Sequence, residues 1–63
     1  MTKALANKIR KALMKSYPKA NSIEQNQWGN WEVTCDNGYE EQIYTFAYEN
    51  DKFRYLGLIR VEI

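Results

Sequence analysis

A chain of 63 residues with one cysteine and no histidine has to fold without the cross-links that usually stabilise domains of this size. A domain this short buries only about 60% of the surface that its unfolded chain exposes, so its stability margin is thin. Cys35 cannot form an intrachain disulfide, and one thiol without histidine supplies no zinc-type ligand set. We therefore expect no metal and no cofactor, and association with another chain is the remaining source of stability.

The charges are unevenly distributed along the chain. Before position 20 the chain contains no acidic residue and six basic ones, which are Lys3, Lys8, Arg10, Lys11, Lys15 and Lys19. In the remainder, three basic residues face eight acids, so the net charge of +1 combines +6 at the N-terminal end with −5 elsewhere. One end of the chain is basic and the rest is acidic.

The same sequence predicts a single domain over residues 1–63, because a chain of this length holds only one. No apolar run approaches the ~20 residues that span a bilayer. The basic N-terminus leads into an interrupted helical pattern rather than the apolar segment of a signal peptide. We expect a cytoplasmic protein that makes no membrane contact.

A helical pattern occupies the N-terminal part of the chain. Apolar residues recur there at i, i+4, i+7 and i+8, and they are Leu5, Ile9, Ala12 and Leu13. Thr2 is the expected N-cap, and Pro18 disfavours helical geometry at Tyr17. The pattern predicts a helix from Thr2 to Ser16, followed by a polar connector over residues 19–27.

From Trp28 onward, aromatic and β-branched residues are separated by two turn signals, Asp36-Asn37-Gly38 and Glu49-Asn50-Asp51-Lys52. This arrangement predicts three antiparallel strands in a meander. We expect them at about Trp28–Cys35, Tyr39–Tyr48 and Phe53–Glu62. The predicted fold is α+β, with the N-terminal helix packed on one face of a three-stranded antiparallel sheet (αβββ).

The last expected strand carries apolar residues on both faces. Strict alternation places on one side Phe53, Tyr55, Ile59, Val61 and Ile63. The other side carries Arg54, Leu56, Leu58, Arg60 and Glu62. One helix about 10 Å wide covers one face of such a sheet, so the face with Leu56 and Leu58 needs a partner, a second copy of the chain or the connector to cover it.

Side chains suited to catalysis are sparse. Without histidine, the commonest general base and every Cys–His or Ser–His arrangement are missing. Glu40 and Glu41 point to opposite faces of a strand, so they form no acid–base pair. The turn Asp36-Asn37-Gly38 lacks the further acidic ligands that a metal-binding loop requires. We interpret Cys35 as a small hydrophobic residue that is buried in the core. We expect a protein that is not an enzyme.

The basic helix allows two interpretations. Lys8, Lys11 and Lys15 line one flank, while Lys3 and Arg10 lie on the other. They form either a solvated face, neutralised in part by acids of the sheet, or a docking surface for an anion such as nucleic-acid phosphate.

Two tryptophans flank Gly29-Asn30. Trp28 and Trp31 are three residues apart, and residues at that spacing on a strand point to opposite faces. At least one indole should therefore be partly exposed, unless a bulge at Gly29 turns it inward. An exposed Trp beside Tyr residues is typical of protein-binding anchors and of base-stacking platforms.

These features favour a non-enzymatic protein-interaction module of the accessory or inhibitor type, which binds a protein partner through the uncovered face of its sheet and forms a homodimer. The residues expected at that contact are Trp28, Trp31, Leu56, Leu58, Arg54 and Arg60. The alternative is a nucleic-acid-binding protein in which sheet aromatics stack on bases. The residues expected to hold its phosphates are Lys3, Lys8, Arg10, Lys11 and Lys15. A sequence pI of 7.8 favours the first hypothesis, because dedicated nucleic-acid domains typically exceed about 9.

Overall fold

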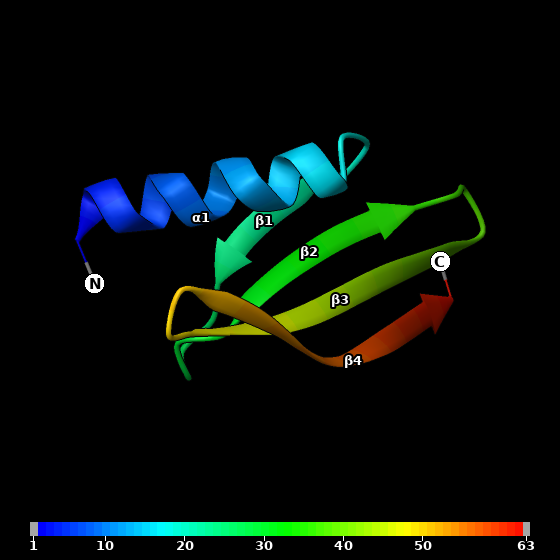
Figure 1. The fold of residues 1–63 in the computed structure, drawn as a ribbon. Helices are drawn as coiled ribbons and strands as arrows, with labels where there is room; N and C mark the ends of the chain where they lie inside the picture. Colours follow the sequence, from blue (N-terminus) through cyan, green and yellow to red (C-terminus); the bar gives the residue numbers. More distant parts are fainter. Residues whose placement is uncertain (1, 63) are drawn as a thin grey trace.

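The computed structural model describes residues 2–62, which form a helix and an antiparallel sheet (Figure 1). Helix α1 spans Lys3–Ser16. The strands are β1 (Ser22–Gln25), β2 (Trp31–Asp36), β3 (Glu40–Glu49) and β4 (Lys52–Glu62), and they neighbour one another in sequence order. The α+β class is confirmed, but the sheet has four strands where three were predicted.

β1 is the strand that the sequence pattern did not predict. It lies in the polar connector, and Ile23 is its one buried residue. Four residues with a single inward side chain show too little alternation to indicate a strand. β1 pairs antiparallel with β2, with Ile23 opposite Val33, and α1 packs against it. The connector therefore widens the sheet beneath the helix and leaves the opposite face without cover.

α1 begins and ends close to the predicted positions. The Thr2 hydroxyl accepts the Leu5 N–H at 3.2 Å, which caps the first turn. The Tyr17 N–H donates to the Leu13 carbonyl at 2.8 Å and closes the last turn. Of the predicted apolar stripe, Ile9 and Leu13 are buried, Leu5 is half-buried and Ala12 is exposed.

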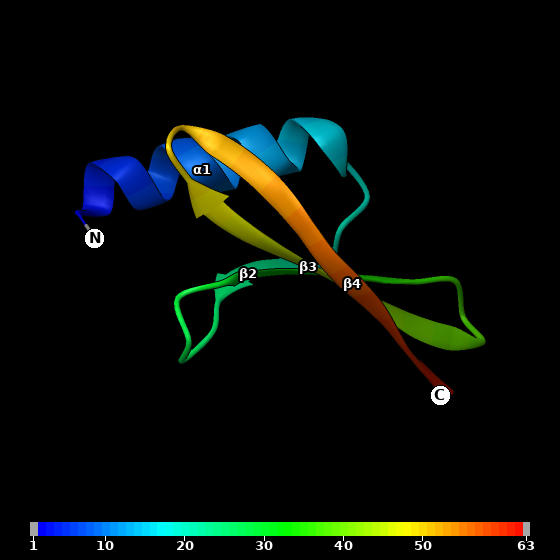
Figure 2. The same cartoon turned by 60° about the horizontal axis from the view of Figure 1, so that its bottom comes forward.

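The core lies between α1 and the β1–β2 half of the sheet. Its buried members are Ile9, Leu13, Ile23, Trp31, Val33 and Phe46. β3 and β4 extend beyond the helix, and in Figure 2 β4 runs obliquely from beside α1 to the opposite end of the molecule. We call the side of the sheet that carries α1 the helix side and the opposite one the far side. The helix covers only part of the helix side.

A β-bulge interrupts the pairing of β3 with β4. Thr45 lies opposite Gly57, and the next residue, Phe46, lies opposite Tyr55. Leu56 is therefore an extra residue without a partner on β3. Gly57 has a φ of 156°, which side-chain-bearing residues rarely adopt, so glycine suits this position.

The bulge changes which side chains of β4 share a face. Directly opposite residues of an antiparallel pair point to the same side. Tyr48 and Tyr44 pack against the core, and they lie opposite Phe53 and Leu58, which are therefore on the helix side. Ile59, the next residue, is on the far side. The prediction that strict alternation puts Phe53 and Ile59 on one face and Leu58 on the other is wrong, because the extra residue shifts the alternation.

Candidate protein-interaction surface

β4 is an edge strand with large apolar side chains in contact with solvent. The exposed fractions are 38% for Phe53, 55% for Tyr55, 44% for Leu56, 56% for Ile59 and 47% for Val61. β3 pairs with one edge of β4, and within residues 2–62 no strand pairs with the other. An edge of this kind offers unpaired backbone groups and apolar side chains to another molecule.

The molecule has more surface than a compact monomer of its mass. Its accessible surface is 4901 Å². A folded monomer of 7.5 kDa is expected to expose about 4,250 Å². The excess is about 650 Å². The elongated shape, with extents of 35 × 20 × 17 Å, accounts for this excess.

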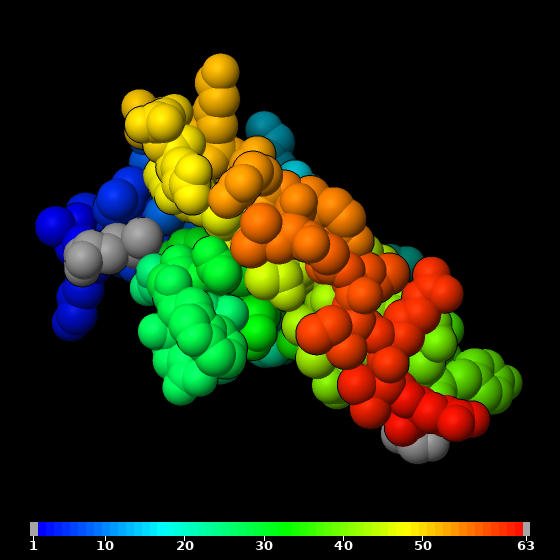
Figure 3. Space-filling model, turned by 90° about the horizontal axis from the view of Figure 1, so that it is seen from below, coloured from blue at the N-terminus to red at the C-terminus, as the bar shows by residue number. Residues whose placement is uncertain are grey.

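The far side of the sheet is polar over β1 and β2 and mixed over β3 and β4. Over β1 and β2 it carries Ser22, Glu24, Glu32 and Thr34. Over β3 and β4 it carries charged residues, namely Glu41 opposite Val61, Arg54, Glu49 and Lys52, and a group of apolar residues, namely Ile43 and Ile59, which lie opposite each other, and Val61. We call these last three residues the far-side patch. Figure 3 shows this side, with the 26–30 loop (green) and β4 (orange to red) flanking a strip of β3.

Trp28 is held in solvent by an ordered loop. Its side chain and backbone together are 75% exposed. The Asn26 side-chain oxygen accepts the N–H groups of Trp28 and Asn30, both at 3.0 Å. The backbone N–H of Asn26 donates to the Asn30 carbonyl at 2.8 Å, and Gly29, with a φ of 82°, donates to the Asn26 carbonyl at 3.0 Å. These hydrogen bonds order the loop backbone before binding, so that only the Trp28 side chain has conformational entropy left to lose, which suits an anchor.

Trp31 was expected at the interaction surface, and that prediction is wrong. It is fully buried at the centre of the core, opposite Phe46. The Arg10 guanidinium lies 5.7 Å from its ring centroid. The predicted strand from Trp28 begins only at Trp31, because the residues between them form the loop. The expectation that at least one of the two indoles is exposed is confirmed by Trp28.

The predicted face with Leu58 between two arginines does not exist as one surface. Leu58 and Arg60 lie on the helix side, where Leu58 is half-buried and Arg60 Nε lies 3.9 Å from a carboxylate oxygen of Glu40. Arg54 lies beyond the bulge on the far side, with its guanidinium 3.5 Å from the Glu49 carboxylate. The bulge at Leu56 therefore puts Leu58 and Arg60 on one side of the sheet and Arg54 on the other.

The basic residues of α1 fall into two classes. Arg10 has a structural role, because its guanidinium donates to the Ile23 carbonyl at 3.4 Å and to the Asn7 side chain at 3.1 Å. The lysines of the helix are exposed, namely Lys3, Lys8, Lys11 and Lys15. Both ion pairs found within residues 2–62 involve arginines, so in this part of the chain no acid of the sheet pairs with these lysines.

The remaining residues with reactive or metal-binding side chains are Cys35 and the acidic residues. Cys35 is half-buried and packs against the core. In the described part of the chain, no three potential metal ligands lie together. No helix within residues 2–62 has the length and apolar character that crossing a bilayer requires.

Comparison with known proteins gave no match. No family model matches the sequence, and searches of the curated proteins and of the solved structures found no significant similarity. The function of this chain therefore has to be inferred from its own surface.

Proposed function

We propose that the protein is a non-enzymatic interaction module of the accessory or inhibitor type that self-associates through the far side of β4. The observation that carries this proposal is the exposure of Ile59 and Val61, at 56% and 47%, on a strand whose outer edge is unpaired within residues 2–62. Apolar side chains of this size on an open strand edge favour association in water.

A specific dimer of standard size buries about 800 Å² on each copy. A two-fold dimer brings the same patch of both copies together, so Ile59 and Val61 of one copy meet those of the other. Trp28 lies on a loop beside this side of the sheet and supplies a second contact (Figure 3).

A charge placed in the far-side patch tests the proposal. We expect the Ile59→Asp variant to remain folded, since Ile59 is 56% exposed, and to sediment at the 7.5 kDa chain mass. The wild type should sediment at twice that mass. Burying an unpaired carboxylate at an apolar contact disfavours the dimer strongly.

Ser22→Asp is the matched control, because Ser22 is exposed on the polar half of the same side. This variant should dimerise like the wild type. Equal masses for Ile59→Asp and Ser22→Asp, with the circular dichroism spectra of both intact, would contradict the assignment of the patch.

A further inference from the structure

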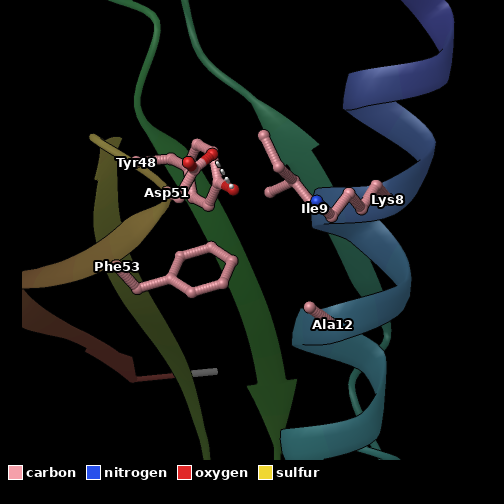
Figure 4. Close-up of a pocket in the computed structure, with 6 residues that line it drawn as sticks. All are labelled: Lys8, Ile9, Ala12, Tyr48, Asp51 and Phe53. Carbon is pink, nitrogen blue, oxygen red and sulfur yellow. Dashed lines mark hydrogen bonds between the residues drawn. The ribbon is translucent and has the colours of Figure 1, made fainter.

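A pocket opens on the helix side between α1 and the β3–β4 hairpin. Its volume is about 230 Å³, and its lining consists of Lys8, Ile9, Ala12, Tyr48, Asp51 and Phe53. Figure 4 shows the three helix residues facing the three hairpin residues across this space. The pocket exists because α1 packs over β1 and β2, while the hairpin curls up beside the helix.

An aromatic strip continues the hairpin wall of the pocket. Between ring centroids, Phe53 lies 5.0 Å from Tyr48 and 6.2 Å from Phe46. The centroids of Phe46 and Tyr55 lie 5.6 Å apart. Tyr17, at the end of α1, lies 5.9 Å from Phe46. Tyr55 is 55% exposed and Phe53 is 38% exposed. The strip therefore presents aromatic surface to solvent next to the helix.

Two lysines of α1 lie on the flank that faces the aromatic strip. Lys8 lines the pocket itself. With 100° between successive helix residues, Lys15 lies about 20° from Lys8 around the axis and about 10 Å further along it. Lys11 points about 160° away from the buried Ile9 and Leu13, so it lies on the outer face of the helix. The opposite flank faces β1, because Arg10 donates to Ile23 there.

We propose that this pocket and strip bind single-stranded nucleic acid, with Lys8 and Lys15 contacting phosphates and with Phe53 and Tyr55 stacking on bases. Single-strand binding requires a positively charged wall beside exposed rings, and both occur here on one side of the sheet. Duplex is disfavoured, because its bases are stacked on one another and cannot reach the rings. This site is independent of the far-side patch.

Asp51 provides a test of the sign of the ligand's charge. Its carboxylate accepts a hydrogen bond from the Tyr48 hydroxyl at 3.5 Å. Asp51 is part of the pocket lining. A carboxylate beside the lysines repels phosphate. Asp51→Asn should therefore strengthen binding of an anion, whereas it would weaken binding of a cation.

The experiment measures binding of a fluorescent oligothymidylate to the full chain by anisotropy, between about 50 and 200 mM salt. Two phosphate contacts predict a slope of about −1.4 for log K against log salt concentration. The variant with Gln at Lys8 and Lys15 should lose most of this slope. The Lys3→Gln variant, on the other flank of the helix, is the control and should keep it.

Stacking is tested separately from charge. Tyr55→Ala should weaken binding about 5- to 150-fold, the effect of losing one stacked base. Tyr55→Phe, which keeps the ring, should bind like the wild type. The Ile59→Asp variant should also bind normally, so this site and the far-side contact fail or succeed independently.

Several outcomes would overturn the proposal. They are no binding at about 50 mM salt, unchanged affinity in the variant with Gln at Lys8 and Lys15, or weaker binding by Asp51→Asn. A glutamate peptide of equal charge has no bases to stack, so it should bind more weakly. Equal affinity for that peptide or for duplex DNA would show a general anion surface and would also overturn the proposal.

Discussion

Tyr17 lies where the helix, the sheet and the aromatic strip meet. Its ring is 5.2 Å from that of Tyr44 and 5.9 Å from that of Phe46. Burial raises the pKa of the Tyr17 hydroxyl above its usual value, and the neighbouring Tyr44, Tyr55 and Cys35 raise it further. The folded state therefore holds the Tyr17 proton more tightly than the unfolded state does.

This pKa shift predicts a loss of stability in alkaline solution. The stabilising contribution of the protonated phenol is complete below the ordinary tyrosine pKa of about 10 and is lost as the pH rises through the raised value. The free energy of unfolding should fall more steeply with pH in the wild type than in Tyr17→Phe. Urea titrations of both proteins at about pH 8 and pH 11 measure this difference. Parallel pH dependence of the two proteins would argue against the coupling.

The two tryptophans show what the sequence could and could not predict about single residues. Their spacing indicated that at least one of Trp28 and Trp31 is exposed, which is correct, although Trp28 lies in a loop and not on the strand. It could not indicate which one enters the core, because that depends on the hydrogen bonds of Asn26 and on the left-handed backbone of Gly29.

The helix is the element that the sequence predicted best, since its stripe and N-cap are both local features. Leu13 is 3% exposed in the core, whereas its neighbour Met14 is 53% exposed. Leu13→Ala should lower the free energy of unfolding by roughly 2–5 kcal/mol, because it leaves a cavity between α1 and the sheet. Met14→Ala is the matched control and should change it by less than about 0.5 kcal/mol. Thermal denaturation of the two variants compares them, and similar melting temperatures would show that the helix is not docked as described.

The sheet elements were predicted less completely for two physical reasons. β1 has one inward apolar residue, Ile23, and is stabilised by pairing with β2 rather than by its own propensity. The bulge in β4 moves Ile59 to the far side, and strict alternation cannot represent an extra residue. An isolated glycine within a strand pattern, here Gly57, is the signal that could have indicated the bulge. The lysine flank of α1 follows from helical spacing, but its position beside the aromatic strip depends on tertiary packing.

At the scale of the whole molecule, the placement of one helix on a four-stranded sheet determines both proposed surfaces. α1 covers the β1–β2 half, so β4 remains uncovered on both sides. The far side of β4 carries the far-side patch, which suits a second copy of the chain. The helix side combines aromatic rings with Lys8 and Lys15 and suits an anionic polymer. The two surfaces differ in their dependence on salt, because charge contacts weaken with ionic strength and apolar contacts do not.

Sedimentation equilibrium of the wild-type chain at low and at high salt tests self-association most directly. We predict a mass of twice 7.5 kDa at both salt concentrations, because the contact is apolar. A monodisperse species of 7.5 kDa at high protein concentration would contradict the account. A dimer that dissociates as salt is added would contradict it equally, because charges rather than the far-side patch would then hold the two copies together.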